Sequence, residues 1–135
     1  MDSDSKQVYQ STEYPFITVT VRILESDLGP MELSCFADTG ATDYDLVLFD
    51  KEFDETKIHQ SPWRQYVPLA GSEYSLIGNQ YLCTIEFGKS GPHTLTILIV
   101  KDHVKVTEAL AGGGFLNRFI SVFNGPQRLL EIHEP

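Results

Sequence analysis

The stretch CFADTGA, at residues 35–41, is the most informative part of this sequence. Here an apolar, strand-like segment runs directly into an acid, a small hydroxyl residue and a glycine. An ordinary turn would also account for these residues, since an aspartate can cap its own backbone there and a glycine can take a positive φ. The Asp-Thr-Gly triplet is therefore weak evidence alone, and its meaning depends on what surrounds it.

Strand-like segments surround this stretch on both sides. Residues 16–23 alternate apolar and polar side chains, which is typical of a half-buried strand, and a turn over residues 27–30 leads back into the apolar residues 31–36. Short alternating runs and turns continue to residue 132, with helical spacing only over residues 115–119. Many short strands separated by turns predict an all-β barrel or sandwich with one short helix near the C-terminus.

Length and charge restrict the possible classes of protein. A chain of 135 residues, 41% of them hydrophobic, fits one globular domain. We expect residues 1–12, which are polar and rich in serine and aspartate, to be a mobile tail, and residues 13–135 to be the domain. The net charge of −9 argues against nucleic acid and against a polybasic contact with a membrane.

Motif and cysteine patterns give mostly negative results. The sequence lacks a CxxC pair, an HExxH motif, a phosphate-binding GxxxxGK[ST] loop and a GxSxG elbow, so we expect no metal and no cofactor. It also lacks an export signal or an apolar run long enough to cross a bilayer. Cys35 and Cys83 fit two buried thiols in a reducing compartment better than one disulfide, and we expect a cytoplasmic protein.

The order of these parts resembles the retropepsin-like aspartic proteases, the single-lobe relatives of pepsin. Residues 37–41 resemble the active-site loop of that family, and residues 64–81 resemble the hairpin called the flap. Residues 110–112, Leu-Ala-Gly, resemble the apolar-apolar-Gly element, which a short helix at 115–119 and a final strand at 129–132 follow. The resemblance implies a single-lobe acid-protease β-barrel with a flap hairpin and one short helix.

The same resemblance implies a set of site residues. The catalytic residues would be Asp38, Thr39 and Gly40, with the Thr39 hydroxyl bracing the loop and Gly40 allowing close approach of backbone. Residues that would contact substrate are Ala41, Thr42, Asp43, Val47, Leu69, Ala70, Gly71, Ser72, Ile77, Leu110 and Ala111. Their mostly apolar character implies a preference for apolar residues around the bond that is cleaved.

A single Asp-Thr-Gly implies a second chain. Aspartic proteases use two carboxylates that share one proton, because two like charges about 3 Å apart do not both ionise readily. One carboxylate activates a water, and the other donates a hydrogen bond to the carbonyl of the peptide bond. This sequence supplies one such acid, Asp38, so we expect a homodimer that hydrolyses peptide or protein substrates. By the same resemblance, residues 129–132 would interleave with those of the partner chain.

Two departures from the family pattern leave alternatives open. The family continues Gly-Arg-Asp/Asn after its apolar pair, whereas this chain has Gly112-Gly113-Gly114, and Thr42 stands where an acid commonly pairs with that arginine. We therefore expect the family's internal salt bridge to be lost and the glycines to loosen the adjacent helix. The alternatives to an active protease are an inactive retropepsin-like domain that binds peptides or dimerises, and an unrelated β-barrel binding module.

Overall fold

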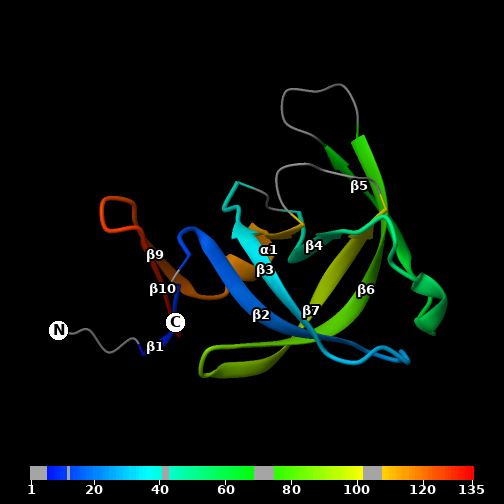
Figure 1. Cartoon of the computed structure of the whole chain (residues 1–135), viewed down its shortest axis with the longest axis horizontal. Coiled ribbons are helices and arrows are strands. Elements are labelled where there is room, and N and C mark those ends of the chain that lie inside the picture. Colours follow the sequence, from blue (N-terminus) through cyan, green and yellow to red (C-terminus); the bar gives the residue numbers. More distant parts are fainter. Residues whose placement is uncertain (1–5, 12, 41–42, 69–74, 102–107) are drawn as a thin grey trace.

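The computed structural model describes residues 6–11, 13–40, 43–68, 75–101 and 108–135. In this part of the chain strands predominate, with one short 3-10 helix and one short α-helix (Figure 1). The elements are β1 (Gln7–Gln10), β2 (Phe16–Ile23), β3 (Met31–Ala37), β4 (Leu46–Phe49), η1 (Glu55–Lys57), β5 (Trp63–Pro68), β6 (Ser75–Phe87), β7 (Ser90–Val100), β8 (Ala109–Ala111), α1 (Gly113–Leu116), β9 (Ile120–Asn124) and β10 (Leu129–His133). This confirms the prediction of an all-β fold.

Six strands close into a barrel. Neighbouring strands follow the order β2-β3-β8-β4-β7-β6, and β6 returns to pair with β2, so that the ring is complete. Closure removes the exposed backbone edges that an open sheet would present. The seventh strand, β5, pairs only with β6 and projects from the barrel as a hairpin, visible in green at the upper right of Figure 1.

Alternating side chains explain why these strands face the core. In β2, residues Ile17, Val19, Val21 and Ile23 are buried while the residues between them are more exposed. Burial of such aliphatic side chains stabilises a fold by about 1.5–3 kcal/mol each, before entropy is subtracted. The alternation in the sequence therefore determines which side chains of β2 face the interior of the barrel.

The two cysteines lie in this core as free thiols, as the sequence predicted. Cys35 is in β3 and Cys83 is in β6, and both are fully buried. Burial raises the pKa of each thiol to about 12, and the nearby carboxylates of Glu108 and Asp45 add to the effect at Cys35 and Cys83, respectively. Both thiols are therefore protonated and unreactive at neutral pH.

Strand β8 lies between β3 and β4, the two strands on either side of Asp38 in the sequence. It runs parallel to β3, with Ala37 opposite Ala111, and antiparallel to β4, with Leu46 opposite Ala111. The segment that carries Asp38 leaves β3 and returns as β4, so β8 lies between the two strands that this segment joins. The loop after β3 is thereby tied to a strand more than 70 residues further along the chain.

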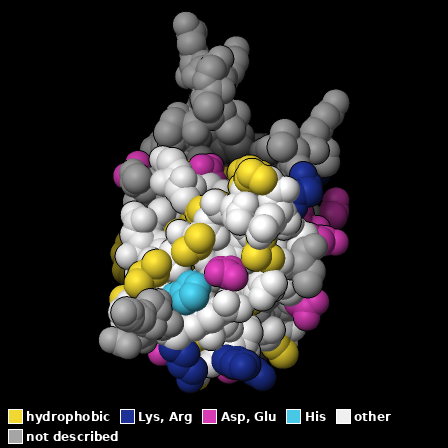
Figure 2. All heavy atoms as spheres, turned by 90° about the vertical axis from the view of Figure 1, so that its left-hand side faces the viewer, with side chains coloured by type: hydrophobic (Ala, Val, Ile, Leu, Met, Phe, Trp, Pro, Cys, Tyr) yellow, Lys and Arg dark blue, Asp and Glu magenta, His cyan; other side chains and the backbone are white. Residues whose placement is uncertain are grey.

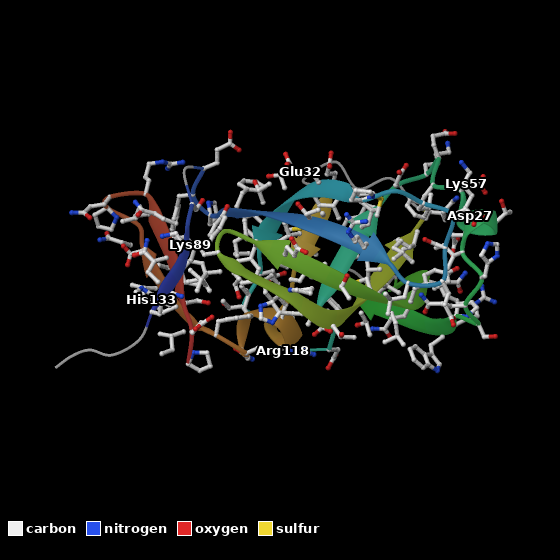
Figure 3. The ribbon with its side chains drawn as sticks, turned by 90° about the horizontal axis from the view of Figure 1, so that it is seen from below. Asp27, Glu32, Lys57, Lys89, Arg118 and His133 are labelled. Atoms are coloured by element: carbon white, nitrogen blue, oxygen red, sulfur yellow. The ribbon has the colours of Figure 1, made fainter. Side chains whose placement is uncertain are left out.

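A separate sheet, in the order β1-β10-β9, contains both ends of the described chain. The predicted mobile tail is wrong for Gln7–Gln10, because Val8 is buried and the backbone of this segment pairs with β10. Strand β10 is likewise not a strand that interleaves with a partner, since β1 and β9 of its own chain occupy both of its edges. Figure 3 shows this sheet, with His133, at one end of the molecule and Asp27 and Lys57 at the other.

The predicted hairpin and helix form with small differences. Strands β5 and β6 pair from Trp63 opposite Gln80 to Pro68 opposite Ser75, and β6 continues without a break to Phe87. Helix α1 begins at Gly113 rather than at residue 115, because Leu116 and Asn117 already donate to the carbonyls of residues 112 and 113. No helix in the described residues is long and apolar enough to cross a membrane.

Candidate active site

Asp38 stands at the mouth of the barrel, immediately after β3. Its amide donates to the carbonyl oxygen of Ala111 at 2.8 Å, so the chain remains anchored to β8 for one residue beyond the strand. The preceding amide, of Ala37, donates to the carbonyl of Pro15 at 3.0 Å. The side chain of Asp38 itself is half-buried. The backbone of the acid is thus fixed while its carboxylate reaches the surface.

The residues after Asp38 form a short turn. The amide of Gly40 donates to Oδ1 of Asp38 at 3.2 Å, which is the self-capping contact of an Asx turn. The other half of the ordinary-turn interpretation does not hold, because the described glycines with positive φ are Gly88 and Gly91, not Gly40. Among the described residues, a Cβ built on Gly40 would meet only Oδ1 of Asp38, at an ordinary 3.6 Å. The described part of the fold therefore does not require a glycine at this position.

Val47 and Leu110, two of the predicted substrate-binding residues, lie together beside this loop. They are paired across β4 and β8 and belong to a small apolar cluster with Leu98 and Val100 of β7. Val47 is fully buried and Leu110 is half-buried, so Leu110 is the better placed of the two to contact a ligand. The third predicted residue of this group, Ala111, is buried and holds the Asp38 amide through its carbonyl.

Ile77 occupies a different place. It is partly exposed and lines an open cavity of about 260 Å³ at the base of the β5–β6 hairpin. Charged side chains share this cavity, namely those of Glu55, Arg64 and Lys101. Six other predicted residues lie outside the described residues: Ala41, Thr42, Leu69, Ala70, Gly71 and Ser72.

Tyr44 is a neighbour of the site that the sequence did not single out. Its ring packs against the apolar cluster of Val47, and partial burial raises the pKa of its hydroxyl. The negative charges of Asp38 and of the exposed Asp43 raise this pKa further. Tyr44 therefore presents a protonated hydroxyl within the electrostatic field of Asp38 throughout the neutral and acidic range.

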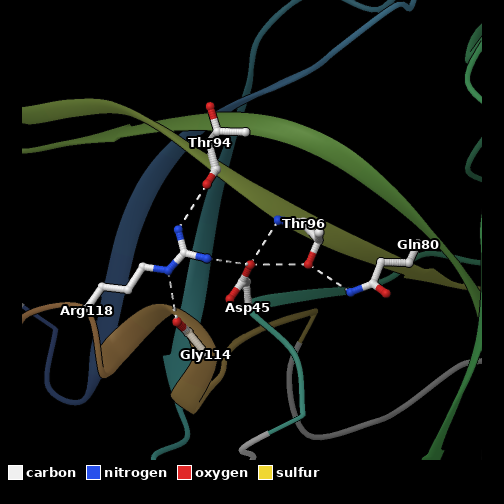
Figure 4. Close-up of polar contacts among 6 residues, drawn as sticks. All are labelled: Asp45, Gln80, Thr94, Thr96, Gly114 and Arg118. Atoms are coloured by element: carbon white, nitrogen blue, oxygen red, sulfur yellow. Dashed lines mark hydrogen bonds and ion pairs between the residues drawn. The ribbon is translucent and has the colours of Figure 1, made fainter.

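Asp45 is a second acid at the same mouth, and its surroundings are quite different (Figure 4). It is buried, and its Oδ2 accepts from the amide of Thr96 at 3.0 Å and from the hydroxyl of Thr96 at 3.2 Å. Arg118, in the turn after α1, reaches the same oxygen at 3.5 Å. The arginine of the family pattern is replaced by Gly113, which cannot form a salt bridge. The Arg118–Asp45 ion pair lies close to this position.

Sequence reasoning missed most of this polar network. Asp45 was visible as an acid inside an apolar run, a signal that a buried acid needs partners within the chain. Arg118 gave no such signal, because its partner lies 73 residues earlier. Within the described ranges, no three His, Cys, Asp or Glu side chains gather in a way that could hold a metal ion.

Comparison with known proteins identifies the fold. No family model matches the sequence, and no curated protein matches it either. A search of solved structures finds a retropepsin-like aspartic protease from Rickettsia conorii, with 15% sequence identity and a TM-score of 0.56. The match covers 98% of this chain and 97% of the other. The chain therefore has the retropepsin-like fold, as its sequence predicted.

Proposed function

We propose that this chain is an aspartic endopeptidase that works as a homodimer, with one Asp38 from each copy forming the catalytic pair. The observation that carries the proposal is the position of Asp38. It follows β3 in a retropepsin-like fold, its amide is held by Ala111, and its carboxylate extends to the surface. The chain contains a single Asp-Thr-Gly, so one copy offers half of such a pair.

The chemistry needs two carboxylates and one proton between them. The ionised carboxylate removes a proton from a water molecule, and the oxygen of that water attacks the carbonyl carbon of the peptide bond. The protonated carboxylate donates a hydrogen bond to the carbonyl oxygen, on which negative charge develops. The resulting tetrahedral intermediate collapses with transfer of a proton to the leaving amine, and no bond to the enzyme forms at any step.

Thr39 and Gly40 support this proposal because the described part of their own chain does not require them. Thr39 is exposed, and a Cβ on Gly40 would have room among the described residues. In a dimer the Thr39 hydroxyl would bond across the two-fold axis, and the missing side chain of Gly40 would let substrate backbone approach Asp38. Leu110 and Tyr44 would line the apolar side of the substrate site, with residues 69–72 of the hairpin closing over it.

Strand β9 is the surface on which we place the second copy. It is an edge strand that pairs only with β10 among the described strands, and it carries the exposed side chains Ile120, Val122 and Phe123. Figure 2 shows hydrophobic side chains gathered on this face of the molecule. Antiparallel pairing of two β9 edges across a two-fold axis would join the two terminal sheets and cover these side chains.

A mixing experiment tests the shared pair. Wild-type chain should cleave a peptide library and be inhibited by a statine-type transition-state analogue, whereas Asp38→Asn should be inactive and fold normally. With wild-type chain held constant near the dimer dissociation constant, added Asp38→Asn chain should lower activity, because mixed dimers carry one intact acid. At equal amounts and full association, about a quarter of the dimers should remain wild type.

Three outcomes would contradict the proposal. Identical cleavage by wild type and Asp38→Asn would assign the activity to something other than this acid. A strict monomer at high concentration would exclude the shared pair. A dimer that binds peptides but never cleaves them would favour an inactive retropepsin-like domain, the alternative that the Gly112–Gly114 departure suggested.

A further inference from the structure

We propose that Arg118 and Asp45 form a positioning pair that holds the Asp38 loop in place, an inference that rests on the proposed function for its catalytic consequence. The pair lies beside the loop, and neither residue takes part in the dyad chemistry. Asp45 precedes β4, and Arg118 follows α1. Together they join the helix, β7 and the end of β8 at one point (Figure 4).

The guanidinium of Arg118 spans three acceptors. Nε donates to the carbonyl of Gly114 at 3.2 Å, Nη1 donates to the carbonyl of Thr94 at 3.0 Å, and Nη2 reaches Oδ2 of Asp45 at 3.5 Å. The planar guanidinium holds its donors in a fixed fork directed at these three acceptors, whereas a lysine would offer a compact ammonium on a flexible stem with no such fixed geometry. The side chain of Arg118 is 48% exposed while that of Asp45 is 11% exposed, so the arginine closes the network from outside.

Backbone hydrogen bonds at the end of β8 connect Asp45 to Asp38. The carbonyl of Asp45 accepts from the amide of Gly112 at 2.7 Å. The carbonyl of Ala111, the residue before Gly112, accepts from the amide of Asp38 at 2.8 Å. Two successive residues at the end of β8 are thus held by the two acids on opposite sides. A shift of Asp45 would move the end of β8, and with it the backbone of the catalytic acid.

The glycine at position 114 is part of the same arrangement. A Cβ there would lie 2.5 Å from Oδ1 of Asp45 and 2.9 Å from the carbonyl of Tyr44, both closer than real contacts allow. The glycine run, which we expected from sequence to loosen the helix, therefore makes room for the buried acid.

Amide hydrogen exchange and kinetics of Arg118→Lys test the pair. We expect the amides of Asp38 and Gly112 to exchange about tenfold faster, while that of Ser11, bonded to Leu130 in the terminal sheet, stays unchanged. Cleavage by the dimer should show a kcat lowered about tenfold with KM within about twofold, because the reacting acid is misplaced and substrate contacts remain. Arg22→Lys, at an exposed position on β2, is the matched control.

A double variant separates a positioning pair from a merely structural one. Asp45→Asn combined with Arg118→Lys should lower kcat by clearly less than the product of the two single effects, because both variants disrupt the same Arg118–Asp45 contact. Unchanged exchange at Asp38 and Gly112, or equal acceleration at Ser11, would overturn the inference. A wild-type chain without Asp38-dependent cleavage would instead overturn the proposed function, and the two amides would still decide whether Arg118 holds the loop.

Discussion

Asp38 and Asp45 are two acids at the same mouth of the barrel with opposite surroundings. Asp45 is buried, and its carboxylate is engaged by Thr96 and Arg118. The carboxylate of Asp38 accepts one hydrogen bond among the described residues, from the amide of Gly40 in its own turn. A buried charge is stable only when its partners lie within the chain, so Asp45 is a structural acid. Asp38 retains acceptor capacity for a ligand or a second chain.

The glycines next to the two acids show the same difference. At Gly114 the chain itself excludes a side chain, because Asp45 fills the space. At Gly40 the described residues leave the space open. A residue that its own fold does not need is a candidate for a role outside that fold. Within the described residues the Asp45 side of the mouth is complete in one chain, whereas under the proposed function the Asp38 side would be completed by a second copy.

The largest expected effect separates these two glycines. We expect Gly40→Ala to lower peptide cleavage about 100-fold through misplacement of substrate and partner loop, with an unfolding temperature close to wild type. Gly114→Ala should lower the free energy of unfolding by about 2 kcal/mol, because overpacking forces Asp45 to move. Thermal unfolding and cleavage assays on both variants measure this. Equal loss of stability in both would remove the distinction between a complete and an incomplete side.

Sequence alone was sufficient for the barrel, while the role of Asp38 stays a prediction, and physical reasons explain where the sequence stopped. The alternation in β2 and the run from β3 into Asp-Thr-Gly are local patterns, and local patterns determine strands and turns. The Arg118–Asp45 contact depends on how α1 packs against β4 and β7, which no spacing within a segment encodes. Strand β1 escaped notice because one buried residue, Val8, stands among polar neighbours.

The second prediction tests whether the incomplete side is completed through β9. We expect Val122→Glu to weaken dimerisation about tenfold, because it brings two like charges together across the two-fold axis of chains that each already carry −9. Activity should fall at low protein concentration and recover at high concentration. Analytical ultracentrifugation measures the dissociation constant, and added salt should partly restore it by screening the charges.

Leu82→Glu is the matched control, since Leu82 is an exposed leucine on β6, outside the terminal sheet. It adds the same charge to the same chain, and we expect its dimerisation to match that of wild type. A dimer of Val122→Glu as tight as that of Leu82→Glu would exclude β9 as the interface. The shared Asp38 pair would then require a different surface, which the mixing experiment would still detect.

The smallest expected effect concerns the part of the molecule that is most completely closed, the barrel core. The pKa of the Cys35 and Cys83 thiols is 9.0 in the unfolded chain and rises to about 12 in the folded chain. Since the folded pKa is the higher one, their contribution to stability is complete below pH 9 and is lost between about pH 9 and 12, as unfolded thiolates form. At pH 10 each thiol should remove about 1 kcal/mol from the free energy of unfolding.

Denaturant unfolding of wild type and Cys35→Ala at pH 8 and pH 10 measures this loss. The variant should be less stable than wild type at pH 8, where the cavity dominates, and should lose less stability between the two pH values. Ser34→Ala, the neighbouring non-ionising position in β3, should keep the wild-type pH dependence. If Cys35→Ala and wild type lost equal stability, Cys35 would ionise alike in the folded and unfolded states. The barrel would then be open to solvent at β3, and the contrast between a closed core and the half-buried Asp38 at its end would fail.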